Sequence, residues 1–151
     1  MYLYLPSFKK VRRIASHVKN TKFAGTDFTY EDMEAIRYSS KYIPKFIKKD
    51  GEYYVLELTP KEGIKTDYSR LMMWIRTDNF YLTKMEHYNR GNKLFKIMTR
   101  NNIEQVNGYW IAKESEMNDL KAKHKTKMII DSVKFDSAFS DNIFSKRNLS
   151  K

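Results

Sequence analysis

Residues capable of chemistry are few and scattered in this sequence. The three histidines, His17, His87 and His124, lie far apart, and there is no cysteine. The chain therefore has no thiol nucleophile and no ligands for cysteine-bound zinc or an iron–sulfur cluster. It also lacks HExxH, GxSxG and P-loop motifs, and its 5 glycines form no phosphate-binding loop. We therefore expect a non-enzymatic protein with no catalytic residue, no metal site and no cofactor.

One acidic cluster could in principle bind calcium. It consists of Asp27, Glu31, Asp32 and Glu34, but it lacks the alternating ligand spacing and central glycine of a calcium loop. Negative charge at the start of a helix explains the cluster better, because it complements the helix dipole. A pair of carboxylates for glycoside hydrolysis stays open, since no spacing marks one.

The chain is strongly basic, with 29 Lys and Arg against 18 Asp and Glu, which gives a net charge of +11. The densest patches are residues 9–13 and the lysines at 121, 123, 125 and 127, which share one face of a strand. Nucleic-acid binding would need exposed aromatic side chains on the same face as the charges. Most aromatics instead lie on the opposite face of the predicted strands, where a core would place them. We therefore expect a solvated lysine-rich face that keeps a sheet edge from pairing with other chains, and no nucleic-acid partner. Binding of the basic face to anionic lipid head groups stays open as an alternative.

Patterns of period two run from end to end of the 151 residues, which is a one-domain length. They predict strands at 1–5, 10–16, 38–48, 52–59, 68–76, 80–88, 93–105, 109–118 and 124–135. Turn signals such as Asp50-Gly51 and Asn107-Gly108 separate them. The fold class predicted is mainly β, a curved antiparallel sheet. A short helix is expected at 29–36, with Thr29 as N-cap, and a last turn at 140–145.

Several predicted strands have one polar and one apolar face, so one side of the sheet must be buried. Phe95 and Ile97, for example, alternate with Lys96. The 8 methionines fall largely on apolar positions, where their flexible side chains suit either ordinary core packing or a surface that accepts varied apolar shapes. No run of about 18 apolar residues is present to form a membrane-spanning helix. The start has no signal peptide and resembles the middle of a strand, so we expect a piece of a longer precursor.

Blocks of sequence along nearly the whole chain resemble the outer-membrane lipoprotein-sorting protein family, whose members are LolA-like. The most specific blocks, in order, are MYLYLP at 1–6, KVRRI at 10–14 and GTDFTYED at 25–32. The resemblance implies a single LolA-like domain over 1–151. Its fold would be a half-open antiparallel β-barrel with an apolar concave face covered by one or two short helices. It also implies a periplasmic location. Family members begin with a signal peptide and with a first helix and strands, which we expect to be missing from this chain.

The function that the resemblance implies is a periplasmic carrier or receptor for lipoprotein acyl chains or another lipid-like ligand. An inner-membrane transporter or outer-membrane acceptor would be its partner. The residues expected to line the concavity are Leu56, Leu58, Leu71, Met73, Ile75, Met85, Phe95, Ile97, Ile111, Met117, Met128 and Ile130. Those expected to form a lid, or simply to seal a core, are Phe28, Tyr30, Met33 and Ile36. The alternative function is an accessory or scaffold subunit that docks on an envelope transporter, and a less favoured alternative is a basic β domain that binds nucleic acid.

Overall fold

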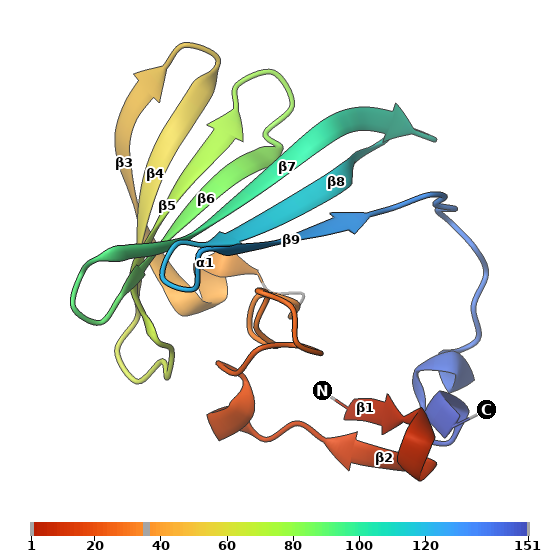
Figure 1. Cartoon of the computed structure of the whole chain (residues 1–151). Helices are drawn as coiled ribbons and strands as arrows, with labels where there is room; N and C mark the ends of the chain where they lie inside the picture. The colour runs from red at the N-terminus through yellow and green to blue at the C-terminus, as the bar shows by residue number, and fades with distance from the viewer. Residues whose placement is uncertain (1, 35–36, 151) are drawn as a thin grey trace.

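The computed structural model describes residues 2–34 and 37–150, and its main element is a curved antiparallel sheet (Figure 1). Seven strands follow each other in chain order, each hydrogen-bonded to the next, and the first and last do not pair. They are β3 (Tyr42–Asp50), β4 (Tyr53–Pro60), β5 (Tyr68–Arg76), β6 (Leu82–Asn89), β7 (Leu94–Val106), β8 (Tyr109–Asp119) and β9 (His124–Ile129). The predicted mainly β class and the open, curved antiparallel sheet are confirmed.

The remaining elements are short. They are β1 (Tyr2–Leu5), η1 (Pro6–Phe8), β2 (Lys10–Arg13), η2 (Ser16–Val18), α1 (Tyr38–Lys41), η3 (Asp141–Phe144) and η4 (Asn148–Ser150). β1 and β2 form a separate antiparallel hairpin, and η4 packs against both strands. Figure 1 shows this hairpin and the C-terminal turns beside each other, away from the large sheet. No helix in the described part of the chain is long and apolar enough to cross a membrane.

Local turn chemistry explains the connections between neighbouring strands. Gly51 has a φ of +57°, and Asn107 and Gly108 have φ values of +49° and +85°. Such left-handed conformations favour glycine and asparagine, which is why these pairs close tight hairpins. The predicted strand boundaries are accordingly close to the observed ones between residues 52 and 119. The ends of the sheet differ more, since residues 38–41 form α1 and β9 stops at Ile129.

The helix expected at 29–36 is wrong over its described part, which forms turns and no helix. Its capping pair is nevertheless present. The Thr29 backbone N–H donates to Asp32 Oδ2 at 2.7 Å, and the Asp32 N–H donates to Thr29 Oγ1 at 3.2 Å. The same Asp32 carboxylate is held by groups on the sheet, which ties this turn to the strands. Ile36 and Met1 lie outside the described residues. The last turn expected at 140–145 is confirmed as η3.

The register gives the sheet an apolar inner face and a charged outer face. On the inner face, Met73 pairs with Met85, Met85 with Met98, and Met98 with Met117. The outer face carries cross-strand ion pairs, such as Arg70–Glu57 at 3.1 Å and Lys125–Glu116 at 3.1 Å. The predicted alternation of a dry and a wet face is therefore confirmed, and the inner face is where a core or a ligand can lie.

Candidate functional site

Half of the inner face is filled by the protein's own side chains. Phe28, from the segment before β3, is buried in one cluster with Tyr42 and Tyr68. Predicted lining residues that lie buried in this cluster are Leu58, Leu71, Met73, Met85 and Met117. Those that are partly buried against it are Leu56, Ile75 and Phe95. The pocket beside this cluster has a volume of only about 40 Å³, so an acyl chain would not fit there unless side chains were displaced.

The faces predicted for two neighbouring residues of β7 are wrong. Lys96 and Met98 are buried on the inner face, and Ile97 pairs with Glu86 and therefore faces outward. Residues 96–99 pair in regular register with β6, so Lys96 shares the inner face of Met98. The register shift between His87 and Tyr88 lies opposite the start of β7 and affects only Phe95. A bulge of this kind places an extra residue in one strand, so Phe95 contacts the core although it directly precedes Lys96.

The remaining predicted lining residues lie on the last two strands of the sheet. Ile111 and Met128 are on β8 and β9, and Ile130 follows β9 directly. Met128 is exposed, while Ile111 and Ile130 are half-buried. Met128 pairs with Ser115, which lies two residues from Met117 and so shares its inner face. This edge of the inner face is more open than the core cluster.

The predicted lid residues have different environments. Phe28 is buried in the core, where it acts as a seal. Tyr30 is half-buried and its ring meets the Phe23 ring edge-on, with centroids 5.4 Å apart. Met33 is exposed. Of the three predicted lid residues that the structure describes, only Phe28 contacts the sheet core in the way that a residue covering a concavity would.

The other half of the inner face is open and aromatic. Phe46 on β3 pairs with Leu56, and its ring lies 6.4 Å from that of Tyr54. The Tyr54 ring in turn stacks on Phe80 at 6.3 Å, from the turn between β5 and β6. Phe46 is 59% exposed and Phe80 is 71% exposed. We call Phe46, Tyr54 and Phe80 the aromatic row, which is an apolar surface available to a ligand.

A buried polar cluster ties the segment with Phe28 to the sheet. The Asp32 carboxylate accepts hydrogen bonds from Lys96 Nζ at 2.7 Å and from the Tyr68 hydroxyl at 2.6 Å. His87 Nε2 lies 3.8 Å from the same carboxylate. Burial by itself would raise the pKa of Asp32, but the Lys96 ammonium and the other neighbours hold it below its usual value. Burial lowers the pKa of His87 to about 4, so this imidazole is neutral near pH 7. The cluster is a structural anchor, which the sequence did not reveal because Lys96 occupies an ordinary alternating position.

A second buried carboxylate fastens the same segment to the far edge of the sheet. Asp27 is fully buried and accepts hydrogen bonds from Lys22 Nζ at 2.9 Å and Thr126 Oγ1 at 2.8 Å, with His124 Nδ1 at 2.6 Å. Burial opposes ionisation, but these hydrogen bonds lower the pKa of Asp27 to about 2. The acidic residues predicted to support a helix start thus hold a long-range connection instead.

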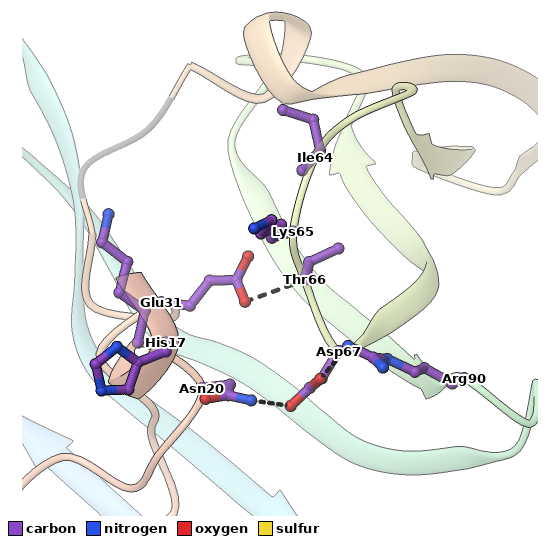
Figure 2. A pocket seen from close by; sticks show the side chains of 9 residues that line it. His17, Asn20, Glu31, Ile64, Lys65, Thr66, Asp67 and Arg90 are labelled. Carbon is purple, nitrogen blue, oxygen red and sulfur yellow. Dashed lines mark hydrogen bonds and ion pairs between the residues drawn. The ribbon is translucent and has the colours of Figure 1, made fainter. Parts of the chain in front are cut away.

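One pocket is lined mostly by polar and charged residues and lies at the edge of the filled half. It has a volume of about 760 Å³ and lies between residues 17–20, the loop before β5 and the turn after β6 (Figure 2). Its lining residues are His17, Lys19, Asn20, Glu31, Ile64, Lys65, Thr66, Asp67 and Arg90. Sequence reasoning missed this pocket, because these residues come together only in the tertiary structure. Within residues 2–34 and 37–150, no group of three His, Asp or Glu side chains could hold a metal ion.

Solved structures share this fold over almost the whole chain. One is described as a "putative outer membrane lipoprotein-sorting protein domain" from Vibrio parahaemolyticus, with 29% identity and a TM-score of 0.92 over 99% of this chain. A DUF1329 family protein from Desulfovibrio piger has 27% identity and a TM-score of 0.90 over 98%. A LolA superfamily protein from Nitrosomonas europaea, at 21% identity and a TM-score of 0.66 over 97%, shows the shared fold alone.

The chain spans 65%, 63% and 66% of the lengths of these three structures, respectively. No curated protein sequence matches it. A family model described as "-like: Uncharacterized protein" matches residues 1–151. The resemblance to LolA-like lipoprotein-sorting proteins is confirmed by these structural neighbours. The chain therefore belongs to the family of that model, and it shares its fold with the LolA superfamily protein from Nitrosomonas europaea.

Proposed function

We propose that this protein is a periplasmic carrier or receptor that binds lipoprotein acyl chains, or another lipid-like ligand, without catalysing a reaction. The observation that carries the proposal is the exposed aromatic row on the apolar inner face of an unclosed sheet. The similarity to a structure described as a lipoprotein-sorting protein domain supports the same function. Its partners would be an inner-membrane transporter or an outer-membrane acceptor, and residues 1–151 would act as one domain.

Acyl binding needs only apolar surface that can be removed from water. Each buried CH₂ contributes about 0.8 kcal/mol, so several methylenes over the aromatic row would give measurable affinity. Leu56 and Ile75 lie next to the row and are partly buried against the core, which extends the apolar surface toward the filled half. In this proposal the core cluster supports the binding surface, and the predicted contact residues within it are not exposed to the ligand.

The proposal is tested by titrating the purified, delipidated protein with a fluorescent fatty acyl probe. Phe46→Ser removes the ring at one end of the aromatic row and should weaken saturable binding about tenfold or more, since a buried Phe contributes about 1.5–3 kcal/mol. Ile43→Ser is the matched control. Ile43 lies on the same strand and is 58% exposed against 59% for Phe46, but it pairs with Thr59 and faces outward.

If the wild type and Phe46→Ser bound the probe equally well, the aromatic row would not be the binding surface. Absence of any saturable probe binding, with no lipid extracted by organic solvent from the protein as isolated, would overturn the carrier function itself. Recovery of an envelope transporter by Phe46→Ser as efficiently as by the wild type, with no acyl binding by either, would favour the accessory-subunit alternative.

A further inference from the structure

The polar pocket is formed by four parts of the chain that are distant in sequence. They are residues 17–20, Glu31, residues 64–67 and Arg90 (Figure 2). Its volume of about 760 Å³ is within the range of sites for small molecules, roughly 300–1,000 Å³. The pocket is distinct from the aromatic row, and its chemistry points to a different kind of group.

Most charges around the pocket are already neutralised. Asp67 forms an ion pair with Arg90 at 3.0 Å and accepts a hydrogen bond from Asn20. Lys19 is paired with Glu34 at 2.6 Å. Among the described residues, Glu31 and Lys65 form no ion pair. The pocket therefore presents one free carboxylate and one free ammonium, together with the outer nitrogens of Arg90.

Glu31 is the unusual member of this set because it is only 9% exposed. Its Oε2 accepts one hydrogen bond, from Thr66 Oγ1 at 3.1 Å, and within the described residues Oε1 accepts none. In Figure 2 the carboxylate points into the pocket beside Thr66. Oε1 keeps contact with solvent, so a donor on a ligand in the pocket can reach it. Such a group is suited to receive the N–H bonds of a ligand.

The surrounding charges favour a cation at that position. Burial raises the pKa of Glu31, and the nearby carboxylates of Asp32 and Asp67 raise it further, against the opposing effects of Thr66 and Lys41. A positive ligand group would relieve this repulsion and hold Glu31 ionised. At the mouth the charge is reversed, since Lys65 is exposed and the Arg90 side chain is 77% exposed.

We propose that this pocket binds a zwitterion in which a primary ammonium donates to Glu31 and a phosphate meets Lys65 and Arg90, which is the chemistry of phosphoethanolamine. An arginine fork and a lysine together suit phosphate oxygens, while a primary ammonium supplies N–H donors that the Glu31 carboxylate can accept. The same chemistry occurs in a free metabolite and in a phospholipid head group. Binding here does not depend on the aromatic row, so it is separable from acyl binding.

Calorimetric titration with phosphoethanolamine tests the proposal without any acyl chain. We expect saturable binding to the wild type, and binding of phosphocholine that is about 10- to 100-fold weaker, because its trimethylated nitrogen cannot donate a hydrogen bond. Glu31→Gln should cause a loss of similar size, and Lys65→Ala a smaller one. The matched control is Glu62→Gln, in the same loop as Thr66 but outside the pocket lining, which should leave binding unchanged.

A second arm distinguishes the two sources of this chemistry. Vesicles of phosphatidylcholine alone are compared with equimolar vesicles of phosphatidylethanolamine and phosphatidylcholine. Co-sedimentation with the mixed vesicles that is lost in Glu31→Gln assigns the site to a lipid head group, whereas calorimetric binding without co-sedimentation assigns it to a free zwitterion. No binding of phosphoethanolamine, or equal binding by the wild type and Glu31→Gln, would overturn the proposal, and neither result depends on the acyl-probe titration.

Discussion

The buried ion pair between Lys96 and Asp32 makes a strong prediction about stability. The two side chains are only 4% and 5% exposed, and their charged atoms are 2.7 Å apart. Lys96→Met keeps most of the apolar stem but leaves the Asp32 carboxylate buried without its cation. Loss of one partner from such a pair costs about 3–5 kcal/mol, because the remaining charge is desolvated and uncompensated. We expect the free energy of unfolding to fall by about that amount.

The assay is urea denaturation followed by the fluorescence of the two tryptophans. Lys125→Met is the matched control, since Lys125 pairs with Glu116 at 3.1 Å on the outer face and is 59% exposed. An exposed pair of this kind contributes only about 0–1 kcal/mol. The double variant Lys96→Met with Asp32→Asn should be more stable than Lys96→Met alone, because no orphaned charge remains.

The pH dependence gives a second readout of the same change. In the wild type the neighbours of Asp32 hold its pKa below the usual value of 3.8, so its contribution is present above that pH and is lost as the pH falls. In Lys96→Met burial dominates and raises the pKa of Asp32, so the variant should lose stability as the pH rises. A Lys96→Met variant no less stable than Lys125→Met, with an unchanged pH profile, would refute the reasoning.

Two further predictions concern the segment that covers the sheet. The folded pKa of Asp27, about 2 against 3.8 for an ordinary aspartate, contributes at most about 2 kcal/mol above pH 4, which should be lost as the pH falls toward 2. Urea midpoints measured over that range should decline less in Asp27→Asn than in the wild type. Phe28→Ala should cost about 3–5 kcal/mol by leaving a cavity in the core, measured by thermal unfolding. A loss below about 1 kcal/mol would mean that the segment is only loosely packed on the sheet.

The sequence alone determined the meander and its two faces. Strand periodicity and turn residues act locally, so Asp50-Gly51 and Asn107-Gly108 specify hairpins wherever the strands lie. Period two also separates Leu58 and Met73 from the charged outer residues without any knowledge of their partners. The family blocks, such as residues 25–32, correctly indicated the LolA-like fold, although the helix expected there is absent over the described residues.

Tertiary structure decided what the inner face contains. The register shift opposite Phe95 lets this residue contact the core although Ile97, two positions later, faces outward, and a one-residue shift of this kind leaves no clear trace in the pattern of side chains. Phe28 and Asp32 fill the same half of the sheet, and Asp32 does so through hydrogen bonds to Tyr68 and Lys96, 36 and 64 positions away, which no local spacing encodes. The pocket around Glu31 likewise depends on loops that meet only after the strands have paired, since buried charge is tolerated only where distant groups arrive to satisfy it.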